Sequence, residues 1–121
     1  MVMPSPAQKV AKPWGYELIF AHTDRYVGKV IFVRQGEELS LQYHERKDET
    51  MFLLSGEAEL VVPDDQGQLK TIRMRPETSY RIPPLTKHRL IAVTDCQILE
   101  ASTPELDDVV RLEDRYGRAG K

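Results

Sequence analysis

The chain has 121 residues, 17 basic and 19 acidic side chains, and a formal net charge of −2. Its length suits one domain that buries roughly two-thirds of the surface of its unfolded chain. The nearly balanced charge argues against a nucleic-acid-binding protein, and no apolar run approaches the ~20 residues of a membrane span. Residues 1–6 lack the apolar stretch of a signal peptide, so we expect a cytoplasmic protein. The only cysteine, Cys96, excludes an intrachain disulfide and favours a buried structural thiol.

Short apolar segments recur at intervals of roughly ten residues, with turn residues between them. In chain order they predict strands at 14–20, 26–33, 38–44, 49–55, 57–62, 69–74, 79–82, 87–93 and 97–102. Short strands without helical periodicity are typical of an all-β sandwich or barrel. We expect an N-terminal arm at 1–12, a barrel at 13–103, and a tail at 104–121 that packs on the barrel. Any helix should be a short turn near residues 104–112.

Gln42, His44, Glu49 and His88 have the donor types and spacing of a divalent-metal site. Side chains two apart on a strand point to the same face, so Gln42 and His44 project together. Residues 45–48 can form a polar turn that brings Glu49 beside them on a paired strand, and His88 opens a later strand. Two imidazoles, a carboxylate and an amide oxygen suit one Zn, Mn, Ni, Co or Fe ion.

Strand alternation predicts what surrounds this site. It places Met51 and Leu90 on the side of the metal and Arg89 away from it. We therefore expect an apolar-walled pocket with its polar groups at one end. Arg89 should be a structural ion-pair partner, and His22, in a polar connector, a surface residue.

The ligand pattern resembles the cupin superfamily. Its first motif, G-X5-H-X-H-X3-4-E-X6-G, is matched here at every spacing, with Gln in place of the first His, by Gly36, Gln42, His44, Glu49 and Gly56. Its second motif, G-X5-P-X-G-X2-H-X3-N, is matched at Pro83 and His88, whereas Glu77 and Leu85 replace its glycines and Ala92 its Asn. The resemblance implies a single-domain cupin β-barrel, a double-stranded β-helix or jelly roll. We expect the lost glycines to alter loop geometry rather than ligand supply.

A closer resemblance is to the type II mannose-6-phosphate isomerases, the C-terminal cupin domains of bifunctional mannose-1-phosphate guanylyltransferase/mannose-6-phosphate isomerases. Residues 12–15 (KPWG) are similar to the R/K-P-W-G of this family, and residues 40–44 (SLQYH) to its S-L-Q-X-H. Residues 107–118 (DDVVRLEDRYGR) resemble its D-D-I-V-R-F-E-D-R-Y-G-R almost throughout. The resemblance covers residues 12–118, and its most specific part is the tail.

This resemblance implies aldose–ketose isomerisation of a sugar phosphate through a metal-stabilised enediol. Because no guanylyltransferase domain is present, we expect isomerisation alone. Lys47 stands where the family has Arg and is the candidate catalytic residue, with a pKa lowered by desolvation beside the metal. It is alternatively a solvated lysine of the turn. Candidate cations for the substrate phosphate are Arg46, Lys87 and Arg115.

Three functions remain open on the sequence alone. The first is the isomerase. The second is a non-catalytic metal- and carbohydrate-binding cupin, favoured because Arg46 and Thr50 replace two histidines of the isomerase family and Met51 its Trp. The third is a metal-dependent oxygenase, against which Gln42 in place of His argues.

Open sheet edges and apolar surface indicate self-association. A small open barrel leaves edge strands with unpaired backbone groups. An apolar surface, which could form a two-fold interface, is predicted at Leu39, Leu41, Tyr43, Phe52 and Leu54. Cupins commonly dimerise with an N-terminal strand reaching across, so we expect a homodimer that uses residues 1–12.

Overall fold

The computed structural model describes residues 1–121 and contains eleven β-strands and no α-helix. The all-β class predicted from the sequence is therefore confirmed. No helix in the structure could cross a membrane. The strands are β1 (Gln8–Lys12), β2 (Gly15–His22), β3 (Val27–Val33), β4 (Leu41–Tyr43), β5 (Glu49–Ser55), β6 (Ala58–Pro63), β7 (Leu69–Arg73), β8 (Ser79–Ile82), β9 (Arg89–Ala92), β10 (Cys96–Ser102) and β11 (Val110–Glu113).

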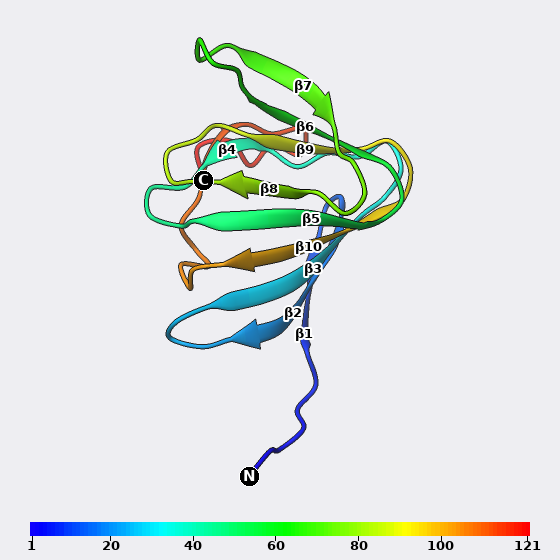
Figure 1. Cartoon of the computed structure of the whole chain (residues 1–121), viewed down its shortest axis with the longest axis vertical. Helices are drawn as coiled ribbons and strands as arrows, with labels where there is room; N and C mark the ends of the chain where they lie inside the picture. The colour runs from blue at the N-terminus through cyan, green and yellow to red at the C-terminus, as the bar shows by residue number, and fades with distance from the viewer.

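The strands form two layers, and every pairing is antiparallel (Figure 1). One layer is a six-stranded sheet in the order β1-β2-β3-β10-β5-β8. The other layer combines the ladders β7-β6-β9 and β11-β4, which are linked by the bridges Gln42↔His88 and Glu38↔Ile91. The core between the layers contains inward side chains of both, among them Trp14, Ile31, Met51, Leu60 and Ile98.

Alternation along the central strands determines which side chains enter the core. In β3 the buried side chains are Val27, Lys29, Ile31 and Val33, with Gly28 buried as well. In β10 they are Cys96, Ile98 and Glu100. Because the period of a strand is two, the charged side chains Lys29 and Glu100 are carried inside with the apolar ones. Cys96 is a buried free thiol, as expected from its sequence context.

Two strands are missing from the sequence prediction. Gln8–Lys12 pairs with β2 of its own chain as β1, so this segment extends the sheet rather than lying apart from it. The expected helical turn near residues 104–112 is wrong, because Val110–Glu113 is the strand β11. β11 pairs with β4, whose other edge carries only an isolated bridge. Pairing satisfies backbone groups on an otherwise open edge, and a local pattern cannot reveal that need.

The two residues that replace the motif glycines keep the backbone conformation of glycine. Glu77 has φ 57° and Leu85 has φ 66°, both in the left-handed region. The expectation that the loops would change shape is therefore wrong at these turns. A left-handed non-glycine residue costs roughly 1–2 kcal/mol. The turn at Leu85 is held against the residue that follows β4, because the N–H of Leu85 donates to the carbonyl of His44 at 2.7 Å.

Candidate metal centre

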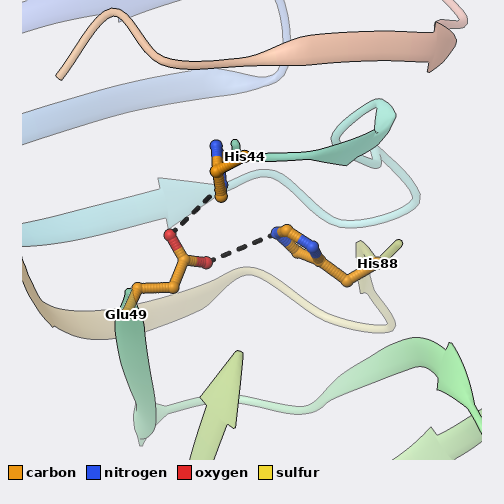
Figure 2. Close-up of side chains that lie close together, drawn as sticks. All are labelled: His44, Glu49 and His88. Carbon is orange, nitrogen blue, oxygen red and sulfur yellow. Dashed lines mark ion pairs between the residues drawn. The ribbon is translucent and has the colours of Figure 1, made fainter. Parts of the chain in front are cut away.

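Three predicted ligands meet inside the barrel, although they come from separate segments. His44 follows β4, Glu49 is the first residue of β5, and His88 precedes β9. Their exposed fractions are 5%, 2% and 2%, and one ligand atom from each lies within 4.8 Å of the other two. Figure 2 shows both imidazoles turned toward the carboxylate, with Nε2 of His44 and of His88 each 3.4 Å from a different Glu49 oxygen.

The hydrogen bonds of the two imidazoles suit a bound cation. Nδ1 of His44 lies 2.5 Å from the carbonyl oxygen of Asp108, and Nδ1 of His88 lies 2.8 Å from that of Thr86. A carbonyl oxygen only accepts, so each Nδ1 carries the hydrogen. With a cation bound, a neutral ring would present the lone pair of Nε2, the atom that faces the centre. Metal-binding histidines are oriented in this way by an outer hydrogen bond.

The Glu49 carboxyl is held in its charged form. Burial raises the pKa of this carboxyl, but the His44 and His88 side chains and the charge of Lys47 lower it more strongly. The resulting pKa lies well below the ordinary glutamate value. An ionised, buried carboxylate between two imidazole nitrogens fits Zn, Mn, Fe, Co or Ni.

Gln42, the fourth predicted ligand, lines the same cavity. Its backbone exchanges two hydrogen bonds with His88, at 3.0 and 2.9 Å, which fixes the two residues side by side. Its role as a ligand stays a prediction. The cavity has a volume of about 50 Å³. A single water molecule needs about 10–15 Å³ of such space, so this cavity suits an ion and a few ligand atoms but not a whole hexose.

A chain of buried charges adjoins the centre. Nζ of Lys47 lies 2.9 Å from Glu49 and 3.0 Å from Glu100. Nζ of Lys29 lies 3.1 Å from Glu17 and 3.9 Å from Glu100. Charges of opposite sign thus alternate along the wall, and three carboxylates face two ammonium groups. The excess negative charge favours a cation at the centre.

The sequence prediction of an apolar wall is wrong on this side of the cavity. It missed Glu17, Lys29 and Glu100, all of which line the cavity. The sequence contained an indication of two of them. Lys29 and Glu100 occupy inward-facing positions of strands whose other inward-facing side chains are apolar. Charged residues at such positions are almost never fully buried unless they are paired.

Lys47 is buried, with an exposed fraction of 4%, so it is not a solvated turn residue. Desolvation lowers its pKa, but the charges of Glu100 and Glu49 and hydrogen bonds to them outweigh this and raise the pKa above the ordinary lysine value. The lowered pKa was expected beside a bound divalent cation and stays a prediction. An ammonium group at this place can stabilise negative charge on a bound molecule.

The tail holds the turn that carries His44 and Lys47. The Asp108 carboxylate accepts hydrogen bonds from the backbone N–H groups of Glu45, Arg46 and Lys47 at 3.0, 2.7 and 2.9 Å. Burial raises the pKa of Asp108, but these donors lower it below the ordinary aspartate value. The carbonyl of the same residue orients His44. Asp108 is thus a positioning residue that sequence reasoning missed.

None of the three cations predicted to bind phosphate lines the metal cavity. Arg46 and Lys87 are exposed. Arg115 donates to the carbonyl of Gly36 at 2.7 Å and forms ion pairs with Glu37 and Glu38 at 3.5 and 3.3 Å. Arg89 is a structural residue as expected, because its Nε donates to the carbonyl of Leu39 at 3.0 Å.

Two facing antiparallel sheets around a buried His–Glu–His centre define the chain as a cupin. Oxalate decarboxylase from Bacillus subtilis has the same fold, with a TM-score of 0.75 at 13% identity over 88% of this chain and 30% of that one. KdgF from Halomonas sp. gives a TM-score of 0.70 at 20% identity over 87% and 97% of the two chains. CapF from Staphylococcus aureus gives 0.72 at 18% identity over 91% and 33%. At these identities the likeness concerns the fold.

Within the cupins, the chain belongs to the mannose-6-phosphate isomerase C-terminal family, whose model matches residues 4–114. Mannose-1-phosphate guanylyltransferase ManC of Salmonella typhimurium is 36% identical over 117 residues, which cover 92% of this chain and 23% of ManC. Alginate biosynthesis protein AlgA of Pseudomonas aeruginosa is 32% identical over 118 residues, 93% of this chain and 24% of AlgA. The chain thus spans about a quarter of the length of these relatives.

Proposed function

We propose that this chain is a metal-dependent aldose–ketose isomerase that acts on mannose 6-phosphate or a related sugar phosphate. The observation that carries the proposal is the buried Lys47 ammonium, held 2.9 Å from a carboxylate of the His–Glu–His centre. An ammonium beside a metal site can stabilise negative charge that develops on a bound substrate. Membership of the mannose-6-phosphate isomerase C-terminal family supports the same substrate class.

Isomerisation moves a proton between C1 and C2 of the substrate through an enediol. A divalent ion held by His44, Glu49, His88 and Gln42 would polarise the substrate oxygens. Lys47 adds positive charge where negative charge develops on those oxygens. Two carboxylates outside the ligand set line the cavity, Glu17 and Glu100. Glu100 is the one that contacts Lys47, at 3.0 Å, so we assign it to carrying the proton between the two carbons.

Interconversion of mannose 6-phosphate and fructose 6-phosphate tests this proposal. In D2O, turnover of the metal-loaded protein should place solvent deuterium on the product carbon that receives the proton. Glu100→Gln should keep its metal and lose about 10²–10⁴-fold in kcat, the usual contribution of a general base. Full metal occupancy without turnover or deuterium exchange on a panel of sugar phosphates would contradict the isomerase.

A second candidate is a non-catalytic metal- and carbohydrate-binding protein. The observation that favours it is the small cavity, about 50 Å³, because only a fragment of a hexose fits beside the ion. Under this hypothesis a sugar binds to the metal-loaded protein with no exchange of its C2 hydrogen. The deuterium measurement therefore separates the two functions.

We also propose that the chain forms a homodimer, through a surface that keeps Phe52 and Leu54 of the one predicted but not Leu39 and Leu41. Leu39 and Leu41 are both buried at 8% exposure, so they are not available. The outward face of the six-stranded sheet instead carries a row of apolar side chains at paired positions, namely Leu18, Val30, Leu99 and Phe52. No element of this chain covers that face (Figure 1), and Leu54 beside the row is 50% exposed.

Sedimentation velocity at micromolar concentration tests the dimer. The wild-type chain should sediment as a dimer, and Leu54→Lys should shift it toward the monomer by placing a charge in the interface. The matched control is Leu69→Lys on β7, where the leucine is 43% exposed on the other layer. A monomeric wild-type protein, or equal effects of the two variants, would contradict this interface.

A further inference from the structure

A second small cavity lies beside the metal cavity, where the N-terminal hairpin, β4 and the tail meet. Its volume is about 50 Å³, and its charged and polar lining includes Lys12, Trp14, Glu17, Gln42, Arg111 and Arg118. Glu17 and Gln42 line the metal cavity as well, so the two spaces share a wall. A cavity of this size holds a group of few atoms rather than a sugar ring.

Positive charge exceeds negative charge around this cavity. Glu17, its one carboxylate, is engaged by Lys29 at 3.1 Å. Arg118 is paired through Nε and one terminal nitrogen with Asp114, at 2.9 and 3.0 Å. Lys12 has no carboxylate within 4.0 Å. No Asp or Glu side chain pairs with Arg111, whose side chain donates to a main-chain oxygen of the last residue, Lys121, at 3.1 Å. Lys12 is therefore left without a counter-charge, and Arg111 keeps an unpartnered Nε–H, at one small space.

Two buried donors in the lining also lack acceptors. Trp14 is 2% exposed, and its indole Nε1 has no hydrogen-bond partner. The Nε of Arg111 is likewise buried and unpartnered. An unsatisfied buried donor costs roughly 1–3 kcal/mol, and more when it is charged. Both groups can only donate, so a ligand that satisfies them must present acceptor oxygens.

We propose that this cavity is an anion subsite that binds the phosphate group of a phosphorylated substrate, with Lys12, Arg111 and the indole of Trp14 as its donors and Arg118 as a further source of positive charge. The preference for an anion follows from the lining of the cavity alone. The assignment of that anion as the phosphate group of the substrate rests on the proposed isomerase function. A phosphate monoester offers a compact dianion with several acceptor oxygens, and arginine recognises it with directed N–H groups. The shared Gln42 wall places the phosphate next to the metal centre.

The subsite depends on the tail folding back across the barrel. Arg111 lies in β11, which pairs with β4, and Lys12 ends β1, which pairs with β2. The two cations are 99 positions apart in the chain and are brought together only by these pairings. The phosphate-binding cations expected from the sequence, Arg46, Lys87 and Arg115, line neither cavity.

Trp14 is the only tryptophan, so its indole N–H gives a single cross-peak in a ¹H–¹⁵N spectrum and reports directly on the subsite. The probe is inorganic phosphate, added at constant ionic strength to protein stripped of metal, so that coordination to an ion cannot produce the signal. We expect a saturable shift of the indole peak. Mannose 6-phosphate should produce it at lower concentration, and unphosphorylated mannose should not produce it.

Arg111→Gln should weaken the phosphate-induced shift at least tenfold. Lys12→Gln, at a half-buried residue with no ion pair, serves as a second variant with less effect on folding. The matched control Arg46→Gln, at an exposed arginine outside both cavities, should bind like the wild type. An indole peak that phosphate and mannose 6-phosphate leave unmoved, or Arg111→Gln and Lys12→Gln variants that bind normally, would overturn the subsite.

The failures of the two proposals can be told apart. If phosphate binds as described and no sugar phosphate is turned over, the proposed subsite is supported and the proposed isomerase activity is contradicted. If turnover occurs but neither Arg111→Gln nor Lys12→Gln raises KM for mannose 6-phosphate, the isomerase activity is supported and the subsite is contradicted.

Discussion

His44→Ala should abolish stoichiometric binding of a divalent metal. It removes one of two imidazoles that face Glu49, leaving a single nitrogen donor at the centre. Loss of an outer hydrogen-bonding partner alone costs 10–100-fold in metal affinity, so loss of a ligand should cost at least ~100-fold. Elemental analysis of purified protein, after dialysis against a weak chelator, measures the occupancy. Isomerase turnover should disappear with the metal.

The third histidine provides the control for this experiment. His22 is the exposed last residue of β2 and lies outside the centre. His22→Ala should therefore keep the metal occupancy and the metal-induced rise in melting temperature of the wild type. An unchanged metal content in His44→Ala would show that the ligand assignment is wrong, whatever the activity of the variant.

Lys47→Met should destabilise the metal-free protein and abolish turnover. The methionine keeps most of the side-chain volume but leaves Glu49 and Glu100 without the ammonium that contacts both. Removing one partner of a buried ion pair costs about 3–5 kcal/mol. Chemical denaturation should show a loss of that size in the free energy of unfolding. Bound metal should restore part of it, because the ion supplies positive charge next to Glu49.

Turnover should fall by ~10²-fold or more in the metal-loaded Lys47→Met variant, because a preorganised positive charge is lost where the negative charge develops. The control is Lys70→Met on β7, where the lysine is exposed and its loss should change stability by less than about 0.5 kcal/mol. The double variant Lys47→Met/Glu100→Gln should recover part of the lost stability, because one uncompensated carboxylate is then neutral. Equal stability and activity of Lys47→Met and wild type would remove Lys47 from the proposed mechanism.

Much of the candidate metal centre could be predicted because its residues follow a pattern that is local in the sequence. Gln42 and His44 share a face through the two-residue period of a strand, and a short turn returns the chain to Glu49. The same period explains why the assignment of most strands survives in the structure. The proposed anion subsite could not be predicted in this way. Lys87 is next to the ligand His88, and adjacent residues of an extended chain point to opposite sides. Arg46 lies in the turn between β4 and β5, where the two-residue period of a strand does not apply.

Two features of this protein were therefore determined by the sequence itself: an all-β fold, and three metal-ligand candidates with backbone spacing that lets them meet. Tertiary structure alone determined which other residues surround these ligand candidates. It brought Glu17, Lys29 and Glu100 to Lys47 and Glu49, and it brought Arg111 to Lys12. These contacts depend on antiparallel pairings between residues up to 75 positions apart, as for Val27 and Ser102. Such pairings satisfy the backbone groups of open strand edges and neutralise the charged side chains that strand alternation places inside the barrel. A local sequence pattern reveals neither requirement.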